Sequence, residues 1–376
     1  MNILFPYMAR WRSANWTRYH ALFTEFAKLG HKIYVIEPPS LKSPETNFID
    51  LDVSVHENIK IITLENPPLW NFSLPYSKVI KKGIYILKLS KIIENLVEKY
   101  NIDILFIYNL PHYILAKKLK GKVKIVFDIA DDLPEMLVHE LPLAKTFIKK
   151  IANTYMHRIE EISDLVITVS EGLKKKTIKD SFIIPNGVDL SLLDKRKAIQ
   201  KKEKVVGFVG SFEYFVDFDL IFYLIENLKY VKFMLVGGGR LFTRVKDIVI
   251  SRKYSNVTLT GAVKHEDICN YLNKFDIALL PFVKSELTDN ACPIKLFEYA
   301  LFQIPIVSRD LKEVKIIGKD FVNFYKNKKE ALSLLLDILN NPERYKEKTL
   351  YGLDAISEKY NWRSISKEYL KLIRNI

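Results

Sequence analysis

The stretch TDNACPIKLFEYALFQIPIVS, residues 288–308, decides the fold more than any other part of this chain. A segment that opens with Pro293 runs to Ala300 and leads directly into the apolar sequence IPIVS. Proline at a first helical position has its φ angle already set and removes no donor that the helix needs, so the sequence predicts a helix followed by a buried strand. The preceding loop is small and polar, which leaves the helix N-terminus and its unpaired N–H groups open to an anion such as phosphate.

Two charged residues lie on one face of this predicted helix. Lys295 and Glu298 are three residues apart, a spacing that places both side chains on the same side. Lys295 can add a positive charge to a phosphate site, and Glu298 can accept hydrogen bonds from two adjacent hydroxyls of a ribose. The alternative is a surface helix with an ordinary ion pair, and the spacing alone does not choose between the two.

Several other segments point, in a fixed order, to the same kind of protein. They are IIPNGVD (183–189), VGFVGSF (206–212), LVGGG (235–239), VTLTGAV (257–263) and DIALLPF (276–282). With residues 288–308 they resemble the motifs of GT-B glycosyltransferases, especially the family 4 type (group 1) and its teichuronic-acid-type subgroup. The resemblance implies an α/β fold of two Rossmann-like domains that face each other across a cleft. It also implies transfer of a sugar from a nucleoside diphosphate sugar to a hydroxyl of a glycan or lipid-linked acceptor, as in the synthesis of cell-surface polysaccharides.

One position departs from the family pattern. Typical family 4 enzymes carry a second glutamate eight residues before the ribose-binding one, and that position is Asn290 here. The teichuronic-acid-type subgroup also lacks this glutamate. The departure therefore leaves the expected fold intact, but it leaves open whether the sugar keeps its anomeric configuration.

The donor is expected to bind at loops that follow strands of the C-terminal half, because ligands of open parallel sheets collect at the carboxyl ends of the strands. Gly210 and Ser211 follow the apolar sequence VVGFV, where glycine lets the backbone approach a phosphate, although a tight strand-to-helix turn is the alternative. A triple glycine precedes Arg240, which either reaches an anion or lies in solvent. Including what the resemblance implies, the candidate nucleotide-sugar residues are Gly210, Ser211, Gly238, Arg240, Val263, Asp289, Asn290, Pro293, Ile294, Lys295 and Glu298.

The resemblance favours a UDP-sugar as the donor substrate and implies no bound cofactor. No carboxylate pair has the spacing and strand context of the metal-binding motif of GT-A enzymes. We therefore expect metal-independent transfer, in which Lys295, Arg240 and helix dipoles stabilise the departing diphosphate. Two other functions stay open: a GT-B-fold sugar-nucleotide epimerase, and a catalytically silent protein that binds sugar nucleotides or a membrane surface.

Short apolar runs alternate with helical patterns along the chain, which is typical of parallel sheets covered by helices on both faces. The charged segment 194–204 interrupts this alternation, which then restarts. We predict an N-terminal acceptor-binding domain at 1–193 and a C-terminal nucleotide-sugar-binding domain at 204–360. The resemblance implies that a final helix at 361–376 crosses back to the first domain. Two domains also suit a chain of 376 residues, which exceeds what one hydrophobic core usually supports.

The composition, with 48% hydrophobic and 27% charged residues, is that of an ordinary globular protein. The N-terminus lacks the pattern of a signal peptide, and no segment is long and apolar enough to span a membrane. Cys269 and Cys292 indicate neither a disulfide framework nor a metal site. We therefore expect a cytoplasmic protein.

The formal net charge of +14 requires an explanation. Nucleic acid, an anionic membrane and phosphorylated substrates would each suit it. No segment interleaves aromatic residues with arginine as RNA-binding proteins do, so we expect no nucleic acid partner. Residues 76–99 and 143–158 alternate lysine with apolar residues at helical spacing, like helices that lie on anionic lipid at the inner face of a membrane. The alternative for either segment is a solvated lysine face over a buried apolar face.

Three carboxylates, Asp128, Asp131 and Asp132, follow the apolar sequence KIVF and are expected to raise one another's pKa. A carboxylate with a raised pKa can take a proton from a sugar hydroxyl. Enzymes of the resembled family often carry a His-Asp pair here, and Asp131 stands at the histidine position. We predict Asp131 as the general base, Asp128 as the second choice and Asp132 as an acceptor contact, with Lys295 completing the catalytic set. The alternative is that Asp131 or Asp132 caps the next helix.

The N-terminal loop PYMARWRSANWTRYH (6–20) is rich in arginine and tryptophan. Arg12 and Arg18 precede or open the first predicted helix, where phosphate binds readily. Trp16 could stack on a sugar. We predict these three residues as acceptor contacts, and the alternative is that the aromatic side chains anchor the loop to the core.

Overall fold

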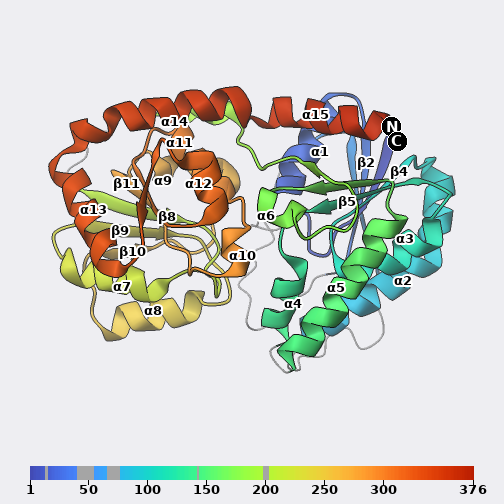
Figure 1. The fold of residues 1–376 in the computed structure, drawn as a ribbon, viewed down its shortest axis with the longest axis horizontal. Helices are drawn as coiled ribbons and strands as arrows, with labels where there is room; N and C mark the ends of the chain where they lie inside the picture. Colours follow the sequence, from blue (N-terminus) through green and yellow to red (C-terminus); the bar gives the residue numbers. More distant parts are fainter. Residues whose placement is uncertain (13–15, 40–54, 66–76, 142–143, 198–202) are drawn as a thin grey trace. The chain divides into compact units, whose positions relative to one another are not determined.

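The structure of this protein, a computed structural model, describes residues 1–12, 16–39, 55–65, 77–141, 144–197 and 203–376. These residues form two compact units, each an α/β domain with its own sheet (Figure 1). The first unit contains the described residues up to Pro185 together with Arg363–Ile376, and the second extends from Asn186 to Trp362. The predicted fold class of two Rossmann-like domains is confirmed.

The first unit is built on seven strands in the order β3-β2-β1-β4-β5-β6-β7, and every neighbouring pair is parallel. The central strands are largely apolar, as is typical of parallel strands covered by helices on both faces. In β4, all four residues of the sequence ILFI are buried. The strands are β1 (Asn2–Pro6), β2 (Lys32–Glu37), β3 (Ile59–Thr63), β4 (Ile104–Ile107), β5 (Lys124–Ile129), β6 (Leu165–Thr168) and β7 (Phe182–Ile183).

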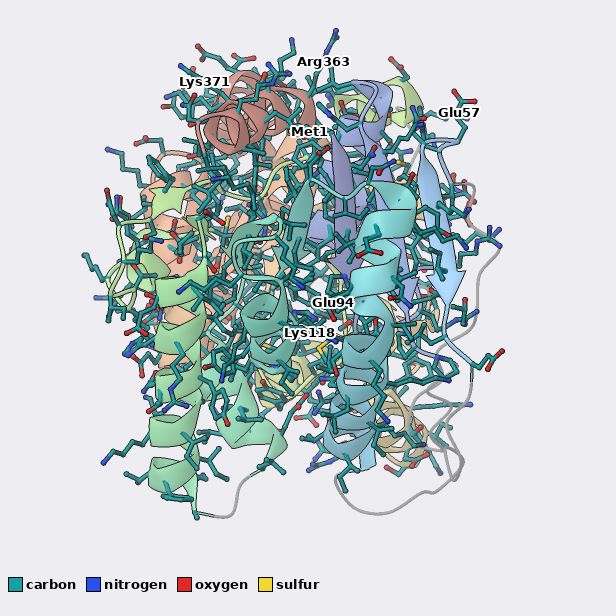
Figure 2. The ribbon with its side chains drawn as sticks, turned by 90° about the vertical axis from the view of Figure 1, so that its right-hand side faces the viewer. Met1, Glu57, Glu94, Lys118, Arg363 and Lys371 are labelled. Carbon is teal, nitrogen blue, oxygen red and sulfur yellow. The ribbon has the colours of Figure 1, made fainter. Side chains whose placement is uncertain are left out.

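Helices cover this sheet, and α2, α3 and α5 lie side by side with α3 between the other two (Figures 1 and 2). None of the helices in the described part of the chain combines the length and the apolarity needed to cross a bilayer. The α-helices of the first unit are α1 (Arg18–Lys28), α2 (Ser77–Tyr100), α3 (Tyr113–Leu119), α4 (Leu133–Glu140), α5 (Lys145–Ile162), α6 (Glu171–Lys174) and α15 (Trp362–Arg374), and a 3₁₀ helix, η1, covers Leu110–His112.

A buried ion pair joins α1, β5 and the C-terminal helix α15. Asp128, at 0% exposure, accepts hydrogen bonds from the Arg18 guanidinium at 3.0–3.2 Å and from the Tyr369 hydroxyl at 2.8 Å. Burial, with the Asp128 charge adding to it, raises the pKa of Tyr369 well above its usual value, so this hydroxyl stays a donor. The Phe26 and Tyr369 rings, 5.8 Å apart, extend the contact into the core. Residues 363–376 therefore belong to the first unit.

The second unit contains a sheet of six parallel strands in the order β10-β9-β8-β11-β12-β13. The strands are β8 (Val205–Val209), β9 (Lys232–Val236), β10 (Val257–Leu259), β11 (Ile277–Leu280), β12 (Ile306–Arg309) and β13 (Val322–Tyr325). The α-helices are α7 (Phe218–Asn227), α8 (Phe242–Ser251), α9 (Cys269–Leu272), α10 (Glu286–Asp289), α11 (Ile294–Leu301), α12 (Lys312–Gly318), α13 (Lys328–Asn340) and α14 (Lys346–Lys359). The 3₁₀ helices are η2 (Leu190–Lys195), η3 (His265–Asp267) and η4 (Pro342–Tyr345).

The units divide at Pro185 and Asn186 rather than at the predicted residue 193. The reason lies in the contacts of the residues that follow. The Asn186 side chain donates to the Cys292 carbonyl at 2.6 Å, and the Val188 amide donates to the Tyr360 carbonyl at 2.8 Å. The segment after Pro185 is therefore fixed to the second unit before the charged stretch begins.

We expect Asp128→Ala to destabilise the first unit by about 3–5 kcal/mol, because it leaves the buried Arg18 charge without its partner. Tyr369→Phe removes only one hydrogen bond to a charged group and should cost about 1.5–3 kcal/mol. Urea unfolding followed by circular dichroism measures both values. A loss below about 1 kcal/mol for Asp128→Ala would show that the ion pair does not hold this unit together.

Candidate functional site

Because its strands are parallel, the second sheet brings four predicted donor segments to one edge. The loops after β8, β9 and β10 contain Gly210, Gly238 and Val263, and these three strands are neighbours in the sheet. The segment between β11 and α11 contains Asp289 and Asn290, and β11 lies next to β8. Residues far apart in the sequence are thus placed together, as expected for a ligand site in an open parallel sheet.

The glycine loops pack backbone against backbone. Gly237 has a φ of +140°, and a Cβ atom there would lie 1.9 Å from the Gly210 carbonyl oxygen. Its amide donates to the Gly261 carbonyl at 3.0 Å, and the Phe212 amide donates to the Gly238 carbonyl at 2.7 Å. No residue with a side chain fits at Gly237. The glycines therefore hold the loops after β8, β9 and β10 in contact.

Arg240 lies at the end of the glycine loop and is engaged within the protein. Its Nε lies 3.1 Å from Glu213 Oε2, and its guanidinium lies over the Tyr214 ring at 5.9 Å from the centroid. Its side chain is 41% exposed. Glu213, which lies two residues after Ser211 in the same loop, was not predicted from the sequence as the partner of Arg240.

Glu298 is a buried carboxylate at this edge of the sheet. It is 1% exposed, and its two oxygens contact Lys295 Nζ at 2.6 Å and His265 Nε2 at 3.0 Å. Burial alone would raise the pKa of Glu298, but the Lys295 charge and the contact with His265 outweigh it and hold the pKa below its usual value. Glu298 is therefore an ionised carboxylate with a cation on one side and an imidazole on the other.

The i,i+3 ion pair that the sequence left as the alternative is present, but it lies in a buried cluster rather than on the surface. His265 was missed by the sequence analysis. The available signal was its position two residues after the VTLTGAV segment, in a loop that lies at the same edge of the sheet.

The start of α11 differs by one residue from the prediction. Pro293 occupies the N-cap position, Ile294 is the first helical residue, and no side chain caps this end of the helix. The preceding loop is fixed by the hydrogen bond from Asn186 to the Cys292 carbonyl. The first N–H groups of α11 are therefore available to a ligand.

Two predicted donor residues, Asp289 and Asn290, are buried and have structural contacts. Asp289 is 8% exposed and accepts a hydrogen bond from the Lys312 amide at 3.1 Å, while Lys284 Nζ lies 3.3 Å from its carboxylate. It therefore fixes α10 to the start of α12. Asn290 is buried and forms the C-cap of α10. The assignment of Asp289 and Asn290 to the donor site stays a prediction.

In the first unit, the three neighbouring aspartates have different surroundings. Asp128 is enclosed by Arg18 and Tyr369, so neither Asp128 as a second-choice base nor Arg18 as an acceptor contact fits the structure; both side chains are 3% exposed or less. Asp132 is 2% exposed, accepts from the Glu135 amide at 3.4 Å as the N-cap of α4, and pairs with Lys176. The capping alternative thus applies to Asp132 and not to Asp131.

Asp131 remains as the carboxylate that solvent can reach. Within the described part of the chain it forms no hydrogen bond or ion pair. Although its side chain is exposed, the surrounding protein limits its hydration. This desolvation, with the negative charges of Asp132 and Asp128, raises the pKa of Asp131 from 3.8 to about 6. Solvent screening moderates the effect of the two neighbouring charges. Asp131 is suited to gain and lose a proton near neutral pH.

The two predicted acceptor contacts of the N-terminal loop lie on either side of residues outside the described part. Arg12 is exposed. Trp16 stacks on His20 at 5.1 Å between ring centroids, and the buried Trp11 stacks on His20 at 4.0 Å. Trp11 therefore anchors the loop to the core, as in the alternative. Trp16 is half-buried, and part of its ring is exposed to solvent.

No group of three His, Cys, Asp or Glu side chains is close enough to hold a metal ion among the residues that the structure describes. Metal independence itself stays a prediction.

Comparison with known proteins identifies the family. Residues 17–192 match the model of glycosyltransferase family 4, and residues 203–341 match the model of glycosyl transferases group 1. The chain belongs to the group 1 glycosyltransferases of the family 4 type. The predicted resemblance is confirmed.

Two relatives match this glycosyltransferase over most of its length. An uncharacterised glycosyltransferase of Methanocaldococcus jannaschii is 22% identical over 86% of this chain and 87% of its own. A Bacillus subtilis protein, provisionally named as a teichuronic acid biosynthesis glycosyltransferase, is 23% identical over 70% of each chain.

Solved structures share the fold. Sucrose-phosphate synthase of Thermosynechococcus elongatus has a TM-score of 0.79 at 15% identity and covers 100% of this chain and 98% of its own. Anabaena HepE in complex with UDP and glucose has a TM-score of 0.72 at 12% identity and covers 100% and 99%. A Listeria monocytogenes protein provisionally described as a UDP-N-acetylglucosamine 2-epimerase has a TM-score of 0.57 at 11% identity and covers 99% and 95%. The fold alone therefore does not separate transfer from epimerisation.

We expect Asp132→Ala to lower the free energy of unfolding by about 0.5–2 kcal/mol, the usual cost of losing a helix N-cap. Asp131→Ala, at the adjacent exposed position, should change it by no more than about 0.5 kcal/mol. Urea denaturation of the two variants side by side gives both values. Equal losses would show that capping is shared between the two aspartates.

Proposed function

We propose that this glycosyltransferase moves a sugar from a nucleoside diphosphate sugar to a hydroxyl of a glycan or of a lipid-linked acceptor. The observation that carries the donor assignment is the buried, ionised Glu298, held by Lys295 and His265 beside the glycine loops. A carboxylate of this kind suits the two adjacent hydroxyls of a ribose, and the uncapped end of α11 suits a diphosphate. The second unit would hold the donor.

UDP is the favoured nucleotide part of the donor, because HepE, one of the structural relatives, was solved with UDP and glucose. A role in cell-surface polysaccharide synthesis is supported by the name of the Bacillus subtilis relative. Both points are proposals for this chain, as is the cytoplasmic location expected from the sequence.

When the donor binds, Lys295 and Arg240 would each leave a glutamate of the protein and contact the diphosphate. An ionised carboxylate offers about four acceptor positions, and Lys295 and His265 contact Glu298 once each. Because Glu298 is 1% exposed, ribose hydroxyls reach it when the 23% exposed Lys295 moves toward the phosphates. Arg240 would leave Glu213 for the same diphosphate. The two cations and the N–H groups of α11 then stabilise the charge that develops on the leaving group.

On the acceptor side, Asp131 would act as the general base. The acceptor oxygen forms a bond to the anomeric carbon of the donor sugar and gives its proton to the Asp131 carboxylate. The bond from the anomeric carbon to the diphosphate breaks, and the diphosphate leaves with the electron pair. A carboxyl with a pKa near 6 is largely ionised at neutral pH and can still hold the proton briefly.

A thermal-shift screen of nucleoside diphosphates, followed by an assay of transfer from the best-binding sugar nucleotide, tests the proposal. A ligand present at 100 times its Kd stabilises a protein by about 2.7 kcal/mol. Stabilisation by UDP and transfer of the sugar support the proposed function. Conversion of the donor into its epimer would favour the epimerase, and binding without turnover would favour the silent binding protein.

We expect Glu298→Ala to weaken UDP binding by about 1.5–3 kcal/mol, the scale of hydrogen bonds to a charged group. Titration calorimetry measures the change. Glu226→Ala is the matched control, because Glu226 lies on α7 and is 47% exposed beside Arg252. Unchanged UDP affinity in a folded Glu298→Ala protein would remove this residue from the donor site.

Transfer should proceed without a divalent metal, because Lys295, Arg240 and α11 supply the positive charge for the diphosphate. Turnover measured in excess EDTA is expected to match that in untreated enzyme. Complete loss of turnover with EDTA, restored by Mn²⁺ or Mg²⁺, contradicts this expectation.

Asp131→Asn should keep donor affinity and lower turnover by roughly 10²–10⁴-fold, the usual contribution of a general base. Asparagine keeps the size of the side chain but cannot take up the proton. In the parent enzyme, kcat/KM should rise as pH increases through about 6, because the base works in its deprotonated form. Near-normal turnover in a folded Asp131→Asn variant, with the same pH profile, would assign the proton transfer elsewhere.

A further inference from the structure

The three neighbouring helices α2, α3 and α5, which lie on the side of the first unit shown in Figure 2, carry an excess of positive charge. The sequences of these three helices contain twelve lysine and arginine residues and only four glutamates. The whole chain has 58 basic and 44 acidic residues. One of the four glutamates, Glu94, is shared between Lys118 and Lys122. The three helices therefore carry more cations than their own carboxylates can neutralise, and Lys82 and Lys149 pair with Glu140 and Glu135 of α4.

Large apolar side chains are exposed on the same face. On α5, Phe147 is 65% exposed, Ile151 39% and Tyr155 40%. Their spacing of four residues places them in one stripe along the helix. The alternative of a solvated lysine face over a buried apolar face stays open, because α5 also buries Ala152, Met156 and Ile159, but it does not account for this exposed stripe. The neighbouring helices also expose apolar side chains: Ile114 of α3 is 39% exposed, and Ile80 and Leu87 of α2 are 48% and 54% exposed.

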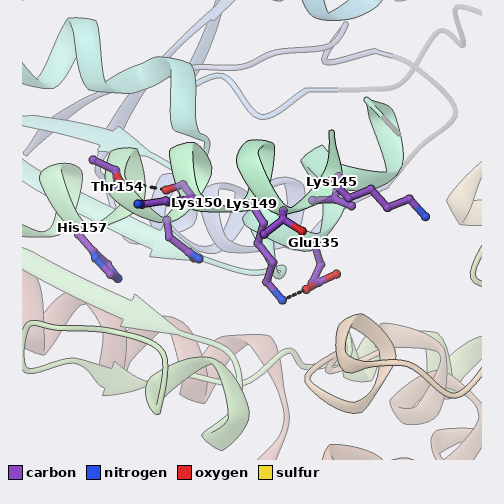
Figure 3. A pocket seen from close by; sticks show the side chains of 9 residues that line it. Glu135, Lys145, Lys149, Lys150, Thr154 and His157 are labelled. Carbon is purple, nitrogen blue, oxygen red and sulfur yellow. Dashed lines mark hydrogen bonds and ion pairs between the residues drawn. The ribbon is translucent and has the colours of Figure 1, made fainter. Parts of the chain in front are cut away.

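A groove of about 560 Å³ runs along α5 where it packs against α4 (Figure 3). Lys145, Lys149 and Lys150 line it together with Thr154 and His157. Lys149 pairs with Glu135 of α4. In the described part of the chain, no carboxylate pairs with Lys145 or Lys150. The groove thus combines cations with hydroxyl and imidazole groups, a combination that suits phosphate.

From these observations we propose that this face, centred on α5, binds the surface of an anionic lipid bilayer. Phe147 and Ile151 enter the boundary between headgroups and acyl chains, and Lys145 and Lys150 contact lipid phosphates. Charge alone would also suit nucleic acid, but nucleic acid would leave the apolar stripe in water. A helix with lysines beside an exposed apolar stripe matches the way amphipathic helices lie in the bilayer interface.

The proposal names a partner of the transferase and the surface that meets it. It would place the first unit at a membrane, where a lipid-linked acceptor is found. Only the access to a lipid-linked acceptor rests on the proposed function. Binding to vesicles is measured without turnover and does not depend on it. The two can therefore fail separately.

The test is co-sedimentation of the full chain with vesicles. One set contains equal amounts of phosphatidylcholine and phosphatidylglycerol, and the other contains phosphatidylcholine alone. We expect binding to the anionic vesicles, weakened by added salt because the surface charges are screened. The double substitution Phe147→Ser with Ile151→Ser should lower the partition coefficient at least about tenfold. Lys145→Gln and Lys150→Gln should each lower it about fivefold, the equivalent of about 1 kcal/mol per basic residue.

Matched controls lie on the second unit. Tyr230 and Ile250 are 69% and 63% exposed, and Tyr230→Ser with Ile250→Ser should leave vesicle binding unchanged. The lysine variants leave no cavity and test the proposal even where the apolar double variant folds badly. Failure of the parent protein to bind anionic vesicles overturns the proposal, as does equal binding by the α5 variants and the controls.

Discussion

All strands within each sheet run parallel, and this constraint places the functional residues of both units. A parallel sheet sends every loop that follows a strand to the same edge. In the second unit, residues 210, 238 and 298 are thereby assembled although they are distant in sequence. The contact between Gly237 and the Gly210 carbonyl, which leaves no room for a Cβ atom, then fixes how closely the loops approach. The direction of the strands thus places the loops of the site, and the side chains then determine the details of their contacts.

The same constraint explains why three neighbouring aspartates have three roles. Asp128 lies within β5, where Arg18 neutralises its charge and Tyr369 donates a hydrogen bond to it. Asp132 lies where α4 begins and satisfies its first N–H groups. Asp131, between them, faces solvent and has two negative charges as neighbours, which contribute to its raised pKa. Three aspartates within five residues of the chain therefore have three roles: Asp128 forms a structural ion pair, Asp132 caps a helix and Asp131 is the candidate base.

The sequence was sufficient to predict the alternating α/β pattern, the two domains and the shared face of Lys295 and Glu298, because these follow from local periodicity. It did not predict partners separated by many residues. Tyr369 meets Asp128 across 241 positions, and His265 meets Glu298 across 33. Such contacts depend on tertiary packing, so Asp128 and Arg18 were assigned to the acceptor site although they are buried. Pro293 was placed one residue too far into α11, since a proline at either position leaves the same sequence signal.

Hydrogen–deuterium exchange of the full chain with and without UDP tests the central claim most directly, because it reports where the nucleotide binds as well as whether it binds. The account predicts protection in the loops after β8, β9 and β10 and at the start of α11, with the segments containing Gly210, Gly238, His265 and Lys295 slowed together. Protection confined to other parts of the second unit, or none at saturating UDP, would contradict the assignment of this edge as the donor site.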